Sequence, residues 1–160
     1  MAEKKTNVMR ALDSAGIFYT AHSYPHGKDA VDGKTVAGLI GLESRRVFKT
    51  LVTRGSSRTV YVYVVPVDRE LDLKKAAAVF GEKSVEMVRL EEINPLTGYI
   101  RGGCSPIGMK KQYQTVIDSS ALCLESMAVS AGKIGLQVEL DPRDLISVTG
   151  AVTAEIIKEH

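Results

Sequence analysis

Residues 47–67 read VFKTLVTRGSSRTVYVYVVPV, and this stretch decides the fold. β-branched and aromatic residues fill its two ends, Val47 to Thr53 and Thr59 to Val67, and the polar segment RGSSR separates them. Two such runs joined by a short polar connection that contains glycine predict a β-hairpin. One residue does not suit a buried strand. Lys49 carries an ammonium group, which is costly to remove from water unless a polar or anionic partner meets it.

The segments around the hairpin show a mixture of helical and strand patterns. Before it we expect a helix, a short strand, a polar lid loop and a second helix, at residues 7–15, 17–24, 25–33 and 34–40. After the hairpin we expect a helix from Asp72 to Phe80, a helical turn over 90–94 closed by Pro95 and Gly98, and a helix that starts at Asp141-Pro142. We also expect strands at 84–88, 114–118, 127–129 and 135–140. These elements do not alternate as regular βαβ units, which predicts an α+β fold with a mixed sheet. No linker or repeat divides the chain, so we expect a single domain over residues 1–160.

The composition is that of an ordinary soluble protein. Of the 160 residues, 44% are hydrophobic and 25% are charged. No apolar segment approaches the roughly 20 residues that cross a bilayer, and no apolar signal segment follows the charged start of the chain. We therefore expect a cytoplasmic protein without membrane contact. A net charge of only +2 excludes a basic nucleic-acid coat, so any RNA contact must depend on local clusters, such as Lys110-Lys111, Lys74-Lys75 or Arg45-Arg46.

The cysteines and histidines indicate neither a metal site nor a catalytic triad. Cys104 and Cys123 form no CxxC pair, and we expect both to be reduced thiols. His22 and His26 lie four residues apart, but Pro25 between them argues against a helix that would put both on one face, and no third ligand is evident. The motifs GxSxG, HExxH and GxGxxG are absent. We expect no metal and no cofactor.

Three segments carry residues suited to chemistry. The first is the strand around Lys49, whose side chain either reaches water at a strand edge, forms an internal ion pair or faces a ligand. The second is the glycine-rich loop, residues 98–108 (GYIRGGCSPIG), whose backbone can approach a ligand closely or simply connect two elements. The third, residues 130–135 (SAGKIG), reads as a hairpin turn. Taken singly, none of the three decides the function.

Together and in this order, these segments resemble the YbaK/EbsC family of freestanding editing proteins, whose fold is shared with the editing domain of bacterial prolyl-tRNA synthetases. The matching stretches are YTAHSYPH, VFKTLV, LDLKK, VEM, TGYIRGGCSPIGMKK and VSAGKIGL, at residues 19–26, 47–52, 71–75, 85–87, 97–111 and 129–136. The resemblance runs from the first expected helix to Leu145. It implies one editing domain in which helices surround a mixed, barrel-like β-sheet.

The resemblance also implies an activity, the removal of cysteine that has been misloaded onto proline tRNA. In this family the thiol of the bound cysteine attacks its own ester carbonyl and releases tRNA and a thiolactone, without a protein nucleophile or a metal. An intramolecular nucleophile has a high effective molarity when a pocket holds it in position, which agrees with the missing triad. The implied partners are the CCA end of tRNA(Pro) and prolyl-tRNA synthetase, and a monomer is the simplest assembly.

The family's functional residues can be carried over by position. Lys49 matches the essential strand lysine, which contacts the terminal adenosine or its phosphate. Gly102, with the amides that follow it, matches the loop that holds the carbonyl side of the substrate, and Ser130 matches a serine that orients the cysteinyl group. We therefore expect Lys49, Gly102 and Ser130 to be catalytic. The expected substrate-binding residues are Tyr24, Thr50, Gly103, Ser105 and Pro106.

Two positions depart from the family pattern. Asp32 stands about where the deacylases often carry an aromatic residue, and Gln137 stands where well-studied members carry an acid. The turn at 130–135 also lacks a basic residue, reading SAGKIG instead of SGGKRG. These differences leave three alternatives open: a deacylase for another small amino acid, such as alanine, that uses an activated water; a non-catalytic binder of aminoacyl-tRNA or of the synthetase; and a cell-surface role.

Overall fold

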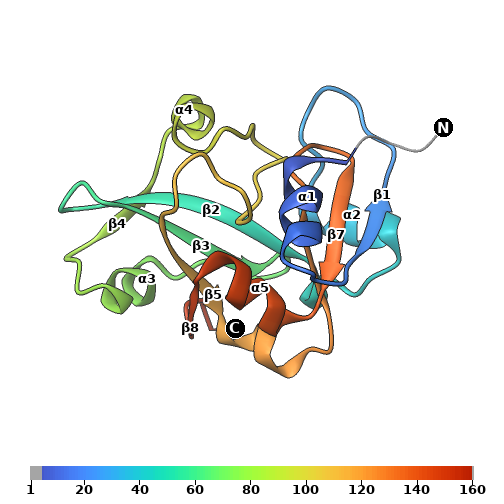
Figure 1. Cartoon of the computed structure of the whole chain (residues 1–160). Coiled ribbons are helices and arrows are strands. Elements are labelled where there is room, and N and C mark those ends of the chain that lie inside the picture. Colours follow the sequence, from blue (N-terminus) through green and yellow to red (C-terminus); the bar gives the residue numbers. More distant parts are fainter. Residues whose placement is uncertain (1–4, 160) are drawn as a thin grey trace.

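The strands form two open sheets in the computed structural model, which describes residues 5–159 (Figure 1). The larger sheet has the order β4-β2-β3-β5-β8, with the bounds Val85–Met87, Phe48–Gly55, Val60–Pro66, Gln114–Asp118 and Val152–Ala154. The smaller sheet has the order β1-β7-β6, with the bounds Thr20–Ser23, Leu136–Leu140 and Met127–Ser130. A bridge between Val47 and Ala128 connects the two sheets. The predicted α+β class is confirmed.

The predicted hairpin forms the centre of the larger sheet. β2 and β3 pair antiparallel, from Phe48 opposite Pro66 to Arg54 opposite Val60. β3 then pairs parallel with β5, and β5 with β8, so the sheet is mixed as expected. Residues 62–65 are fully buried because a hydrophobic cluster packs on each face of β3. Burial on both faces explains why this strand reads as an unbroken apolar run without polar alternation.

The helices lie around the two sheets (Figure 1). The α-helices of the described residues are α1 (Asn7–Ser14), α2 (Gly33–Ile40), α3 (Leu73–Val79), α4 (Ile93–Thr97) and α5 (Pro142–Thr149), and the short 3₁₀ helices are η1 (Ser44–Arg46), η2 (Leu90–Glu92) and η3 (Ser119–Cys123). The side chains of Thr6, Asp32, Asp72 and Asp141 accept hydrogen bonds from backbone amides in the first turns of α1, α2, α3 and α5. None of these helices, in the part of the chain that the structure describes, is long and apolar enough to cross a membrane.

The structure differs from the sequence expectations at four places. The sheets do not close into the barrel-like sheet expected, because the three strands of the smaller sheet pair only with one another and meet the larger sheet at a single bridge. The strand expected over 17–24 is restricted to Thr20–Ser23. Pro95 does not close a turn, because it lies in the first turn of α4, where a missing N–H costs no helical hydrogen bond. β8 has no counterpart among the predicted elements, since three residues give no periodic signal.

Candidate active site

A cavity of about 180 Å³ opens where the two sheets meet. Its walls come from the start of β2, the paired ends of β6 and β7, the lid loop (residues 25–33) and the glycine-rich loop. Pockets for drug-sized ligands have roughly 300–1,000 Å³, so this cavity suits a small chemical group. The structure brings together five of the predicted site residues on this cavity: Tyr24, Lys49, Thr50, Gly102 and Ser130.

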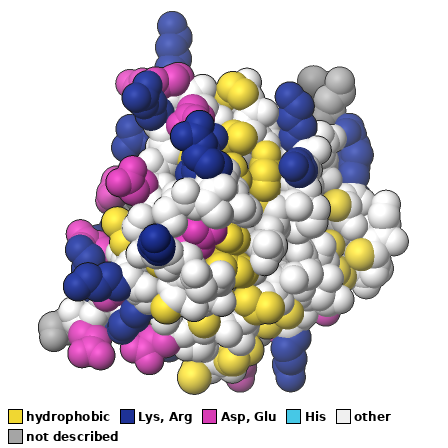
Figure 2. Space-filling model, turned by 90° about the vertical axis from the view of Figure 1, so that its left-hand side faces the viewer, with side chains coloured by type: hydrophobic (Ala, Val, Ile, Leu, Met, Phe, Trp, Pro, Cys, Tyr) yellow, Lys and Arg dark blue, Asp and Glu magenta, His cyan; other side chains and the backbone are white. Residues whose placement is uncertain are grey.

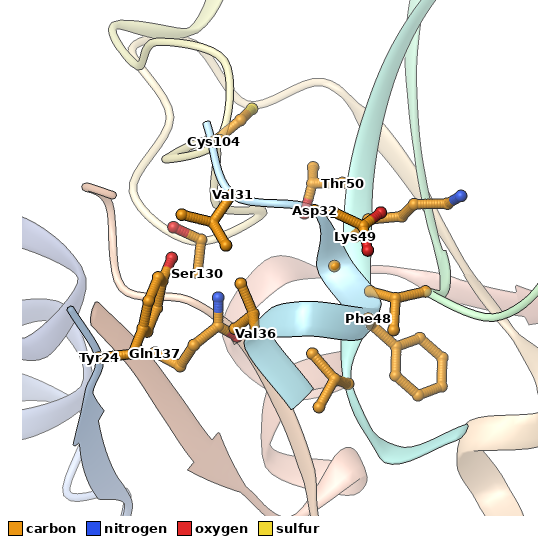
Figure 3. A pocket seen from close by; sticks show the side chains of 14 residues that line it. Tyr24, Val31, Asp32, Val36, Phe48, Lys49, Thr50, Cys104, Ser130 and Gln137 are labelled. Atoms are coloured by element: carbon orange, nitrogen blue, oxygen red, sulfur yellow. The ribbon is translucent and has the colours of Figure 1, made fainter. Parts of the chain in front are cut away.

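β2 contributes Lys49 and Thr50 to one wall, at an edge of the larger sheet. β4 pairs with β2 only from Thr53 to Gly55, so the strand edge is uncovered at Lys49 and Thr50. The half-buried Lys49 side chain runs past Asp32, and its ammonium group points away from Tyr24, Ser130 and Gln137 (Figure 3). No carboxylate within residues 5–159 forms an ion pair with it. The Thr50 hydroxyl is buried without a hydrogen-bond partner, so both side chains are available to a ligand.

The smaller sheet supplies the opposite wall. Its register places Ser130 of β6 beside Gln137 of β7, and the Tyr24 amide donates to the Gly135 carbonyl at 2.9 Å, which brings Tyr24 next to them. The Ser130 hydroxyl accepts a hydrogen bond from the Gly132 amide at 3.1 Å, so its own proton remains available for donation. Gln137 is only 6% exposed, and its amide oxygen has no hydrogen-bond partner. Because such orphaned atoms are rare, Gln137 joins the candidate ligand contacts.

The glycine-rich loop meets the lid loop at Gly102. Gly102 has φ = +85°, and a Cβ added to it would lie 2.6 Å from the Cβ of Ala30, so only glycine allows this close approach. The amide of Gly103 donates to the Ile100 carbonyl at 3.0 Å. The amides of Gly102 and Cys104, in contrast, have no acceptor within residues 5–159. Both residues line the cavity, so their amides are candidate donors to an oxyanion.

A family model, the aminoacyl-tRNA editing domain, matches residues 27–148, which contain every cavity residue named above except Tyr24. The chain belongs to this editing-domain family. A protein of Enterococcus faecalis (strain ATCC 700802 / V583), provisionally named the Cys-tRNA(Pro)/Cys-tRNA(Cys) deacylase EbsC, is 44% identical over 154 residues, which are 96% of this chain and 94% of that protein. The resemblance to YbaK/EbsC editing proteins is thereby confirmed.

Other relatives link the editing domain to proline tRNA ligases. The proline–tRNA ligase of Thermosipho africanus (strain TCF52B) is 36% identical over 76 residues, which are 48% of this chain and 13% of the ligase. A solved structure, provisionally described as a trans-editing enzyme for prolyl-tRNA synthetase, matches with a TM-score of 0.84 and 25% identity, over 98% of this chain and 100% of that one. The same fold thus exists as a freestanding protein.

Three residues expected to bind substrate have no surface on the cavity of this editing domain: Gly103, Ser105 and Pro106. A Cβ added to Gly103 would lie 2.9 Å from the Cα of Lys133, so glycine lets the loop pack against the turn that follows β6. Ser105 is fully buried, and its hydroxyl accepts a hydrogen bond from the Ile107 amide at 3.3 Å. Pro106 is buried in the same loop. Packing and internal hydrogen bonds occupy these residues, which shape the loop.

The cavity of the editing domain contains no activated protein nucleophile. Burial raises the pKa of the Cys104 thiol to about 11, so this thiol is protonated near neutral pH and is a poor nucleophile. Neither His22 nor His26 lines the cavity, so no imidazole within residues 5–159 stands beside the hydroxyls of Thr50 and Ser130. No group of three His, Cys, Asp or Glu side chains in residues 5–159 could hold a metal ion. Among the described residues, the cavity therefore offers no thiolate, no hydroxyl paired with a base and no metal-bound water.

An ion network beside the Gln137 wall was not predicted from the sequence. His22 Nε2 lies 2.8 Å from Glu139 Oε1, and Arg46 Nη2 lies 2.8 Å from the other oxygen of that carboxylate. Burial opposes ionisation of Glu139, but hydrogen bonds from Ser126 and His22 and the charge of Arg46 hold its pKa below the usual range. The network connects η1, which precedes β2, to β7. Its members lie up to 117 positions apart, so no motif reveals it.

Proposed function

We propose that this protein is a trans-editing deacylase that removes cysteine from mischarged Cys-tRNA(Pro). One observation carries the proposal: a single cavity joins Lys49, which has no carboxylate partner within residues 5–159, to the free amides beside Gly102. Membership of the editing-domain family supports an aminoacyl ester as the substrate. The Enterococcus faecalis relative, whose provisional name describes the same reaction, supports cysteine and proline tRNA.

The substrate would enter with its amino acid inside the cavity and its adenosine at the mouth. The cavity has room for a small aminoacyl group but not for a whole nucleotide. Lys49 lines the cavity with its ammonium group turned away from the wall that carries Ser130, and this group would contact the terminal adenosine or its phosphate through a charge-assisted hydrogen bond (Figure 3). Tyr24 and Thr50 would line the aminoacyl pocket, and Ser130 would orient the cysteinyl group.

The chemistry would be an intramolecular transfer of the acyl group to sulfur. The thiol of the bound cysteine attacks the ester carbonyl carbon, the bond from that carbon to the ribose oxygen breaks, and the thiol proton passes to the ribose oxygen. The products are uncharged tRNA and a cyclic thiolactone. The amides of Gly102 and Cys104 would donate to the oxyanion that forms on the way. Holding the thiol near the carbonyl supplies a high effective molarity, so the protein needs no nucleophile of its own.

Asp32 supports a second candidate, hydrolysis of another small aminoacyl ester by water. Its carboxylate lines the cavity close to the Lys49 side chain (Figure 3), and a carboxylate can act as a general base toward water. In the native fold this carboxylate caps α2, where it accepts a hydrogen bond from the Thr35 amide at 3.3 Å. The thiol mechanism requires sulfur in the substrate, whereas the water mechanism does not.

A panel of three substrates tests the proposal and separates the candidates. Cys-tRNA(Pro), Ser-tRNA(Pro) and Ala-tRNA(Pro) are incubated with the wild-type protein and with Asp32→Asn, and release of the amino acid is measured. Serine differs from cysteine only in having oxygen in place of sulfur. We expect release of cysteine alone, as the thiolactone, by both proteins. Equal release of serine or alanine, lost in Asp32→Asn, would instead establish the water mechanism.

The remaining proposals concern context. We propose that residues 1–160 form one editing domain, which works as a monomer in the cytoplasm on the CCA end of tRNA(Pro), without a cofactor. The similarity to a segment of the Thermosipho africanus proline–tRNA ligase supports prolyl-tRNA synthetase as the partner that supplies the substrate. Co-purification of the two proteins in the presence of tRNA(Pro), absent when the tRNA is omitted or exchanged, would test this association.

A further inference from the structure

A groove of about 330 Å³ continues outward from the cavity. The two hollows share Thr50, Gly102 and Cys104, so the rim of the cavity is also the inner end of the groove. The groove runs between β2 and the segment from β4 to α4. The face of the molecule that carries β4 and α4 is turned to the viewer in Figure 2, where hydrophobic side chains gather in a band with lysine and arginine side chains on both sides.

The walls of the groove are apolar and accessible. Met87 is 49% exposed and Leu90 is 56% exposed, and Ile93 stands beside them on the groove. Large apolar side chains that gather in one exposed groove mark a binding surface. Arg101 is the one charged residue among the groove's lining residues, and it forms no ion pair within residues 5–159. The groove therefore combines apolar walls with one cation that has no carboxylate partner there.

These features match a single nucleotide of an unpaired RNA strand. A nucleobase presents flat apolar faces, and its phosphate carries one negative charge. Proteins bind unpaired RNA by stacking aromatic or arginine side chains on the bases and by placing positive charge along the backbone. In this groove aliphatic side chains and Met87 provide the apolar surface, and Arg101 provides the charge. If the aminoacyl group occupies the cavity, the attached strand has to leave across the rim, and the groove starts at that rim.

We propose that the groove binds the nucleotide that precedes the terminal adenosine of the substrate. Its base lies against Met87, Leu90 and Ile93, and its phosphate meets Arg101. This inference rests on the proposed function, because it takes an aminoacyl ester at the end of an RNA as the occupant of the cavity. Continuity with the cavity favours RNA over a protein partner as the occupant. The groove then gives the protein a preference for esters at the end of an RNA strand over esters of adenosine alone, without contact to the tRNA body.

Two short substrates test the inference. One is the cysteinyl ester of adenosine, and the other is the cysteinyl ester of the trinucleotide CCA. The wild-type protein is expected to have a kcat/KM about tenfold higher for the trinucleotide, the scale of one base contact. Leu90→Asp, which replaces an apolar contact to the base with a carboxylate, and Arg101→Gln, which removes the cation at the phosphate, are expected to abolish this preference, mainly through KM. Leu122→Asp is the matched control, because Leu122 is 54% exposed and lies outside the groove.

Each outcome of this experiment supports or overturns the proposal that the groove binds a nucleotide. Loss of the preference in Leu90→Asp and Arg101→Gln, with the preference intact in Leu122→Asp, supports the inference. An equal loss on both substrates, or a preference unchanged by either groove variant, overturns it. An effect of Leu90→Asp that is seen only when prolyl-tRNA synthetase is present makes the groove a protein-docking surface and also overturns it. If the wild-type protein cleaves Cys-tRNA(Pro) but neither short ester, the inference is overturned and the proposed function stands; if it does not cleave Cys-tRNA(Pro) either, the proposed function fails.

Discussion

The polar side chains at the two ends of the β2–β3 hairpin differ in whether they have partners within the protein. At the tip, polar groups are satisfied within the protein: the Tyr61 hydroxyl donates to Glu82 at 2.6 Å, and Ser57 donates to the same carboxylate. At the base, where the hairpin lines the cavity, the Thr50 hydroxyl is buried without a partner, and Lys49 has no ion pair within residues 5–159. One hairpin thus carries both kinds of environment at its opposite ends.

This difference separates polar groups that stabilise the fold from polar groups that are available to bind a ligand. A buried polar group without a partner costs about 1–3 kcal/mol, so a native structure tolerates it where a ligand supplies the missing bond. At the tip, removing a side chain should lower stability and leave activity alone. At the base, removing a side chain should lower activity and leave stability alone. The following variants test this division.

Lys49→Ala should have the largest effect, at the base of the hairpin. We expect deacylation of Cys-tRNA(Pro) to fall by about 100-fold or more, the scale of losing a contact that positions the substrate for reaction. The free energy of unfolding should change by less than about 0.5 kcal/mol, because no protein partner within residues 5–159 loses an ion pair. Lys83→Ala, at an exposed position away from the cavity, is the control. Wild-type rates in the Lys49→Ala protein would show that Lys49 has no part in the reaction.

Gly103→Ala should lower both stability and deacylation, because Gly103 packs tightly against the turn that follows β6, next to the base of the hairpin. The added Cβ would lie 2.9 Å from the Cα of Lys133, and backbone cannot move aside as a flexible side chain does. We expect unfolding to become easier by about 1–3 kcal/mol, as in other overpacked cores, and deacylation to fall because the turn that carries Ser130 shifts. Gly27→Ala is the control, since nothing lies within 4 Å of its added Cβ. Equal stability of the two variants would contradict this packing.

Glu82→Gln should lower stability without lowering deacylation, because Glu82 contacts residues at the tip of the hairpin, away from the cavity. Hydrogen bonds from Ser57 and Tyr61 lower the pKa of Glu82 from 4.5 to about 2. A carboxylate with a lowered pKa stabilises the fold fully above its unfolded-state pKa and loses that contribution as the pH falls toward 2. The urea midpoints of wild type and variant should therefore differ at pH 7, and the difference should shrink as the pH falls below 4.5 and disappear near pH 2. A gap that widens at low pH would refute this assignment.

Cys104→Ala is the last and smallest expected change, and it concerns the rate of deacylation. With a pKa of about 11 the Cys104 thiol is protonated at neutral pH, and only its amide is assigned a part in the reaction. We expect the deacylation rate to change by less than about tenfold, far from the loss that follows removal of a true nucleophile. The pH dependence of the rate should be unchanged. A loss of several orders of magnitude would show that the protein thiol performs the attack.

Much of the fold follows from local signals. The hairpin is visible as two β-branched runs around a polar turn, and α5 begins where Asp141-Pro142 predicts a cap and a first helical residue. The division into two open sheets is not visible, because it depends on which distant strands pair. β8 pairs with β5 through only three residues, too few for a pattern. Pairing between distant segments is a tertiary property, and single-segment periodicity carries no information about it.

The site was predictable where a residue conflicts with its local pattern. Lys49 in an apolar strand is such a conflict, and it lines the cavity. Ser105 and Pro106 have no such signal, and they pack inside the loop instead of facing the cavity. Gln137 stands out only once coordinates show its amide oxygen without a partner. The network of Glu139 with Arg46 joins residues 93 positions apart, which no local pattern connects.

The most direct test is the structure of the protein with a stable substrate analogue, in which an amide replaces the ester between cysteine and 3′-amino-3′-deoxyadenosine. The cysteinyl group should occupy the cavity between β2 and the β6–β7 wall, with its carbonyl oxygen near the amides of Gly102 and Cys104 and its adenosine near Lys49. The Thr50 hydroxyl and the Gln137 amide should gain hydrogen-bond partners. An analogue bound elsewhere, with Thr50 and Gln137 still unpartnered, would contradict the account.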